Sequence, residues 1–148
     1  MQALQKNTEN VTPIQNDPVE QISCNGQHIA TIIRSDYMPD KTTFLSPDSY
    51  YQQAGFVVYP KGGVVARHCH LPLQRHLVGT PETLIVRKGK AEVDLYDLQK
   101  QLIGTWILNE GDIILLAAGG HQLRCLMDTV FFEIKQGPYT GLVEKEIF

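Results

Sequence analysis

The sequence predicts an all-β domain built as a sandwich or a barrel. Short runs rich in Val, Ile, Leu and aromatic residues alternate along the chain with turns that contain Gly, Pro, Asn or Asp. Many short strands at regular spacing are typical of these two architectures. No segment of ten or more residues has the apolar period of an amphipathic helix. The 148 residues, 43% of them hydrophobic, suffice for one domain with one core.

The elements can be assigned in chain order. Residues 1–20 are polar and contain two prolines, so we expect a flexible N-terminal arm, followed by a single domain at 21–148. Asn25-Gly26 lies between two apolar runs, which is the strongest short signal for a β-hairpin. Residues 37–48 contain two prolines and are expected to be mainly a loop. Further strands are expected at 42–45 (short), 55–59, 64–70, 82–87, 91–96, 103–108, 113–116, 122–126 and 129–135.

The C-terminal segment predicts a shaped turn and a short tail. Residues 136–141, Q-G-P-Y-T-G, contain two glycines and a proline. We expect them to fold residues 144–148 back over the domain. The alternative is that the apolar end of this tail packs on a neighbouring subunit.

Composition excludes several classes of partner. The net charge is −3 and the pI is near 5.9, so the chain has no basic footprint for nucleic acid. No apolar run approaches the ~20 residues of a membrane-spanning helix. The N-terminal residues lack the apolar region of a signal peptide. We therefore expect a cytoplasmic protein that binds neither nucleic acid nor a membrane.

The three cysteines give no disulfide framework. Cys24, Cys69 and Cys125 are odd in number and widely spaced, and no two of them have the spacing of a zinc site. We expect reduced thiols that are mostly buried.

Histidines are concentrated in one segment. Three of the five fall in residues 67–82, R-H-C-H-L-P-L-Q-R-H-L-V-G-T-P-E. His68 and His70 are two positions apart, so on a strand their side chains project from one face. Glu82 opens the next predicted strand, and His121 follows a glycine turn after another. Three imidazoles and a carboxylate suit one divalent metal such as iron, manganese, nickel, copper or zinc, with positions left open for water or substrate.

Two stretches of the sequence, each marked by glycines at fixed positions, resemble the paired motifs of the cupin superfamily. In the first block, Gly62, His68, His70, Glu82 and Gly89 match the family's glycine, His-x-His, glutamate and glycine. The resemblance extends from about residue 53 to the C-terminus. It implies a double-stranded β-helix, or jelly-roll, barrel. It also implies a homodimer, because cupins commonly pair through sheet edges.

In the second block, Gly111 and His121 match the glycine and the fourth ligand. The resemblance thus implies that His68, His70, Glu82 and His121 bind the metal. Both blocks depart from the usual pattern. Eleven residues separate His70 from Glu82 where three or four are usual, and Ala117 replaces a proline. His76 lies in this insertion and is the alternative ligand to His70, which we prefer because the His-x-His spacing needs no ordered loop.

A narrower resemblance concerns the ligand. The phrases R-H-L-V-G-T-P-E, K-G-K-A-E-V-D-L-Y-D and E-I-K-Q-G-P-Y are similar to those of small cupins found with bacterial polysaccharide and sugar-nucleotide biosynthesis proteins. This resemblance implies a sugar-derived or other small-molecule ligand.

Three further residues are candidates for contact with that ligand. Arg75 is placed to hold a carboxylate or phosphate by a bidentate contact, or else is a solvated charge. Gln53 is a candidate for the rim of the site. Glu133 alternates with Phe132 and Ile134 along a predicted strand, so its side chain points to the opposite face from theirs. If the apolar residues face outward, Glu133 faces the pocket and is a candidate general base. If they face inward, Glu133 is a surface charge, which we slightly prefer.

Three classes of function stay open. The first is a metal-dependent enzyme, isomerase-like, epimerase-like or dioxygenase-like, that acts on a small polar metabolite or sugar derivative. The second is a binding or sensor protein without chemistry. The third is a structural protein whose metal stiffens the barrel. Fold alone does not choose among them.

Overall fold

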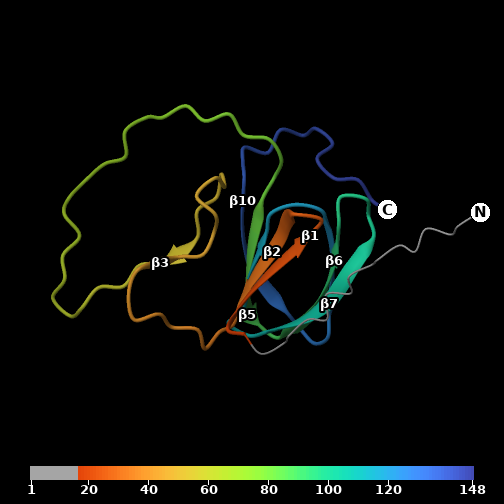
Figure 1. The fold of residues 1–148 in the computed structure, drawn as a ribbon, viewed down its shortest axis with the longest axis horizontal. Helices are drawn as coiled ribbons and strands as arrows, with labels where there is room; N and C mark the ends of the chain where they lie inside the picture. The colour runs from red at the N-terminus through yellow and green to blue at the C-terminus, as the bar shows by residue number, and fades with distance from the viewer. Residues whose placement is uncertain (1–16) are drawn as a thin grey trace, which may run out of the picture.

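The structure is a computed structural model that describes residues 17–148 (Figure 1). This range contains strands and loops but no helix, and therefore no helix that could cross a membrane. Most of the predicted N-terminal arm lies outside the described residues, and the first strand begins at Val19. The strands are β1 (Val19–Cys24), β2 (Gln27–Ile33), β3 (Thr43–Phe44), β4 (Gly55–Phe56), β5 (Glu82–Lys88), β6 (Lys90–Tyr96), β7 (Leu102–Asn109), β8 (Ile113–Leu116), β9 (Gly120–Cys125) and β10 (Val130–Lys135).

Two antiparallel sheets enclose the core. The larger has the order β1-β2-β8-β5-β10, the smaller has the order β7-β6-β9, and β3 pairs with β4 separately. Alternate residues of the facing strands are buried between the sheets, because successive side chains of a strand point to opposite faces. This core contains Ile22, Ile32, Leu84, Val86, Ile114 and Leu116 from the larger sheet and Val93, Leu95, Trp106 and Leu108 from the smaller. The predicted all-β class is confirmed, but the sheets of the described chain do not close into a barrel.

The first hairpin forms where the sequence predicts it. Asn25 and Gly26 connect β1 to β2 with φ angles of 51° and 74°. Positive φ at both central residues is the requirement of a two-residue hairpin turn whose twist matches its strands. Ile22 of β1 lies opposite Ala30 of β2, and both are buried in the core.

A buried ionic network joins the ends of several strands. Asp112, 2% exposed, follows the β7–β8 turn and accepts hydrogen bonds from Arg34 Nη1 (3.0 Å), from the Ser35 amide (2.9 Å) and from the Asn109 amide (2.9 Å). Arg34 also donates through Nε to Glu20 Oε1 at 2.9 Å. Because both carboxylates pair with one guanidinium, their charges are compensated away from solvent.

Two predicted strands are shorter or absent. The strand expected at 55–59 contains only Gly55–Phe56, and the strand expected at 64–70 is irregular. Residues 57–81 instead form one long loop that swings away from the sheets (Figure 1). The physical reason is that β-branched residues favour a strand only when a neighbouring strand pairs with it, and none lies beside this loop. The same sheets leave β9 and β10 at their edges, each paired on one side only.

The cysteines are free, as predicted, but they are not mostly buried. Cys24 is half-buried, whereas Cys69 and Cys125 are exposed. Cys69 lies in the loop at 57–81 and Cys125 ends the edge strand β9, so neither is covered by another sheet.

Candidate functional site

Glu82 and His121 meet at one end of the two sheets. Glu82 is the first residue of β5 and lies opposite Leu116, whereas His121 is the second residue of β9 and lies opposite Leu95. Leu116 and Leu95 both belong to the core, so the two polar side chains occupy the inner faces. His121 Nε2 lies 3.5 Å from Glu82 Oε2.

This pair has a geometry that two ligands of one metal could adopt. Two donor atoms about 2.1 Å from a metal lie about 3.0 Å apart at octahedral angles and about 3.4 Å apart at tetrahedral angles. The observed 3.5 Å separation is close to the second value. The pair therefore fits half of the predicted ligand set.

The protonation of His121 also suits a ligand. Burial lowers its pKa, and the positive charge of Lys145 lowers it further, while the carboxylates of Glu82 and Glu133 oppose the shift. A histidine with a lowered pKa is neutral at physiological pH and keeps a lone pair for a metal. The side chain of Glu82 is 9% exposed and that of His121 is 33% exposed, so the pair remains open on one side.

Glu133 lies on the same inner face. In the β10–β5 pairing, Lys135 is opposite Glu82 and Glu133 is opposite Leu84. Lys135 Nζ lies 3.0 Å from Glu133 Oε1, and this contact raises the pKa of Lys135. Phe132 and Ile134 point to the outer face, where they are 55% and 45% exposed. Of the two orientations left open by the sequence, this register corresponds to the one with the charged pair inward.

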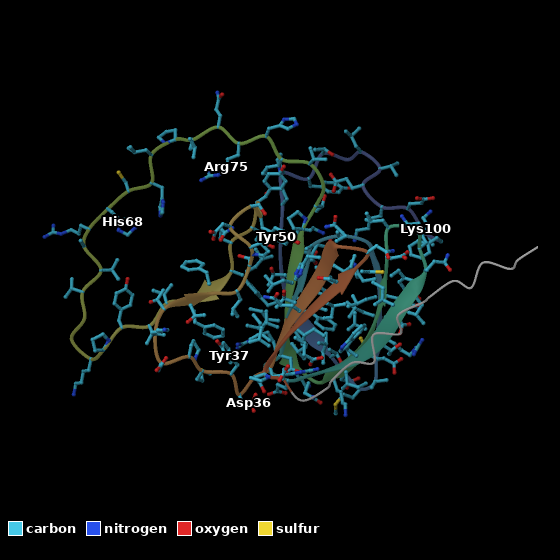
Figure 2. The ribbon with its side chains drawn as sticks, viewed as in Figure 1. Asp36, Tyr37, Tyr50, His68, Arg75 and Lys100 are labelled. Carbon is cyan, nitrogen blue, oxygen red and sulfur yellow. The ribbon has the colours of Figure 1, made fainter. Side chains whose placement is uncertain are left out.

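The other two predicted ligands lie elsewhere. His68 and His70 are exposed in the loop at 57–81, with their ring centroids 5.3 Å apart. Figure 2 shows His68 on the far part of this loop, away from both sheets. The structure thus brings together His68 with His70, and Glu82 with His121, but not the two pairs. Within residues 17–148 no group of three or more His, Cys, Asp or Glu side chains could hold a metal ion.

The remaining candidates are also outside the Glu82–His121 pair. His76 and Arg75 are exposed in the same loop, and Figure 2 places Arg75 apart from the sheets. Gln53 donates through Nε2 to the carbonyls of Pro47 (2.9 Å) and Tyr50 (3.0 Å), so it shapes a turn. Its neighbour Gln52 accepts a 3.0 Å hydrogen bond from Thr83.

The tail adds a residue that the sequence did not single out. Residues beyond 141 fold back as predicted, and the Phe148 ring packs on Tyr96 with centroids 5.2 Å apart. Lys145 lies in this returning segment, and its positive charge lowers the pKa of His121. No local pattern around Lys145 predicts this effect, because it depends on where the tail crosses the sheets.

Comparisons with protein-family models, with curated proteins and with solved structures find no match for this chain.

Proposed function

We propose that this chain is a metal-binding cupin in which His68, His70, Glu82 and His121 bind one divalent metal. The observation that carries the proposal is the Glu82–His121 contact. These residues come from the two different motif blocks, yet their donor atoms lie 3.5 Å apart on facing sheets. A neutral imidazole and a carboxylate at this separation match the chemistry of a first-row metal such as iron, manganese, nickel or zinc.

The proposal requires the loop at 57–81 to close onto the sheets. His70 is separated from Glu82 by eleven residues, which span up to ~40 Å when extended at about 3.3 Å per residue. The loop is therefore long enough to carry both histidines to the pair. The open edge of β9, beside His121, is the place where residues 64–70 would add a strand.

Two properties of the loop support such closure. Its apolar side chains are unusually exposed, with Val64 at 84% and Val65 at 55%. Burying a valine stabilises a fold by about 1.5–3 kcal/mol. Loops of this length without secondary structure are also uncommon in compact domains, where they are usually either functional, as lids or binding loops, or disordered. Closure along β9 and β10 would convert the two sheets into the jelly-roll barrel of the cupins.

We propose a small polar metabolite, such as a sugar derivative, as the ligand. A bound metal would polarise a carbonyl or hydroxyl of that ligand. Glu133, on the inner face beside Glu82, is the candidate base for isomerase-like or epimerase-like chemistry. Arg75 would enter the site with the loop and contact an anionic group.

A non-catalytic binding protein is the second candidate function. The ion pair of Glu133 with Lys135 favours it, because Lys135 Nζ occupies one oxygen of this carboxylate and would have to be displaced before that oxygen could contact a ligand. Under this alternative the metal and the inward charges hold a sugar-derived ligand without turnover.

We also propose a homodimer. The outer face of β10 exposes Phe132 and Ile134, and an apolar surface at a sheet edge is a common place for pairing. Light scattering of the full chain would give the mass of a dimer, and a monomeric mass at all concentrations would contradict it.

The experiment that tests the metal is elemental analysis of the full chain purified without chelator or added metal. We expect about one equivalent of a single divalent metal per chain. Iron would direct assays to oxygen-dependent reactions, whereas manganese, nickel or zinc would direct them to isomerases and lyases. No metal, with none taken up on titration, would overturn the proposal.

A further inference from the structure

The loop at 57–81 starts from the outer face of the larger sheet. On that face, Leu115, Thr83 and Ile134 form one row across β8, β5 and β10. The segment that precedes the loop is fastened to this row, because Gln52 accepts a 3.0 Å hydrogen bond from Thr83. Figure 1 shows the loop running outward on the side of the sheets where β3 lies.

The same outer face is apolar and exposed at its β10 edge. Ile85 of β5 lies opposite Phe132 of β10, and both Phe132 and Ile134 are exposed. The loop ends at this edge, since Glu82, the residue that follows it, lies opposite Lys135 of β10. Contiguous exposed apolar residues are typical of a surface that contacts another protein. The loop therefore borders the surface proposed above for the homodimer.

The loop itself has the composition of a contact surface. Val64, Leu71 and Val78 are among its highly exposed apolar residues. Its charged residues are all basic: Lys61, Arg67 and Arg75. All 16 acidic residues of the chain lie outside the loop, and the chain as a whole has a net charge of −3. A cationic loop on an anionic chain is complementary in charge to a second copy of that chain.

The loop is long enough to reach such a copy. Eleven residues separate Phe56 from His68, and eleven separate His70 from Glu82, so each arm spans up to ~40 Å at about 3.3 Å per residue. The chain's own β9 belongs to the smaller sheet, across the core from the face at which the loop starts. A copy that docks on the β10 edge lies on the side toward which the loop already runs.

We propose that the loop at 57–81 is exchanged between two copies of this chain, so that His68 and His70 of one copy complete the Glu82–His121 site of the other. The inference rests on the proposed metal site and deepens it by making a second copy part of that site. Exchange of an identical element between subunits is a low-cost route to a dimer. It would bury the apolar residues of the loop and join each histidine pair to the half-site that it lacks.

The test is a mixed dimer of two full-length variants, co-expressed with different affinity tags and purified through both. One chain carries His121→Ala, and the other carries His68→Ala with His70→Ala. With loop exchange, the intact loop of the first chain meets the intact Glu82–His121 pair of the second. Elemental analysis should then give one metal per mixed dimer, half the content of the unaltered dimer. The dimer of either variant alone should contain much less.

The outcomes separate loop exchange from the metal site itself. If the unaltered chain binds one equivalent but the mixed dimer binds no more than the single-variant dimers, loop exchange is overturned and the metal proposal stands. A monomeric mass for the metal-loaded, unaltered chain would overturn loop exchange as well.

A second measurement decides the case in which the unaltered chain binds no metal and the metal proposal fails. Val64→Asp combined with Val65→Asp should convert the dimer to a monomer in light scattering, because it places two charges in the buried contact. Leu98→Asp changes an exposed leucine between β6 and β7, so it should leave the dimer intact. A double variant that stays dimeric would show that the loop is not exchanged.

Discussion

His121 Nε2 lies 3.5 Å from Glu82 Oε2 across the space between two sheets. The contact does not arise from nearness in the sequence, since Glu82 begins β5 and His121 lies in β9. It arises because the core places the inner faces of these strands opposite each other at one end. The pair is therefore the part of the candidate site that forms without the loop at 57–81.

Replacing His121 tests whether this pair belongs to a metal site. We expect His121→Ala to lower metal affinity at least tenfold, because a lost ligand removes a coordination bond and leaves the carboxylate of Glu82 without a partner. Elemental analysis of the purified variant measures the change. His76→Ala is the matched control, since His76 lies in the same exposed loop as His70 but outside the proposed ligand set, and it should retain full occupancy.

Two results would revise the ligand set. Full metal content in purified His121→Ala would remove His121 from it. A large loss in His76→Ala would instead move one ligand from His70 into the insertion at 71–81.

Loop closure predicts a change in amide hydrogen exchange. Residues 57–81 carry few backbone hydrogen bonds, so their amides should exchange rapidly in the metal-free chain. Addition of the metal found on purification should slow exchange in residues 64–70 and at the edge strand β9. Exchange in β6, which is already paired on both sides, should not change. Identical exchange of residues 64–70 with and without bound metal would show that the loop does not close.

Local sequence signals predicted the hairpins. They did not predict the loop at 57–81, because its conformation depends on contacts between residues far apart in the sequence. Asn25-Gly26 specifies its turn by backbone conformation alone, and β6 alternates buried and half-buried residues as its sequence implies. Whether residues 64–70 form a strand depends instead on a partner strand far along the chain, which Val64 and Val65 cannot specify. Motif spacing paired Glu82 with His121, but nothing near Lys145 indicates that its charge lowers the pKa of His121.

The sequence likewise did not predict the buried network around Asp112. The residue pattern Gly111-Asp112 reads as an ordinary turn, whereas the carboxylate accepts hydrogen bonds from Arg34, Ser35 and Asn109. Such a network appears only when the ends of β2, β7 and β8 are assembled.

Asp112→Ala should destabilise the fold strongly. The change removes one of the two carboxylates that pair with Arg34 and leaves two backbone amides without their acceptor, and removing one partner of a buried ion pair costs about 3–5 kcal/mol. Urea unfolding followed by circular dichroism gives the free energy of unfolding. Asp40→Ala, at an exposed loop position, is the control and should change it by less than about 0.5 kcal/mol. A similar small change for Asp112→Ala would refute the structural role of the network.

The loss of folding stability at acid pH should depend in part on His28. Its Nε2 lies 3.0 Å from Thr31 Oγ1 and its ring lies 5.4 Å from that of Tyr50, and burial lowers its pKa below 6.5. The unfolded chain therefore binds a proton at His28 more readily than the folded chain. The stability contributed by the neutral residue is complete above pH 6.5 and is lost as the pH falls from 6.5 through the lower pKa of the folded state. His121, whose pKa is also lowered, acts in the same direction.

His28→Gln should flatten this dependence, because glutamine can keep the hydrogen bond to Thr31 and does not titrate. Urea unfolding at about pH 7.5 and about pH 5.5 compares the two proteins at both ends of the transition. The loss of unfolding free energy between these pH values should be smaller in the variant than in the unaltered chain. His76→Gln, with an exposed side chain, should lose as much as the unaltered chain. If His28→Gln and His76→Gln lose equal amounts, the packing of Tyr50 over His28 does not control its proton affinity.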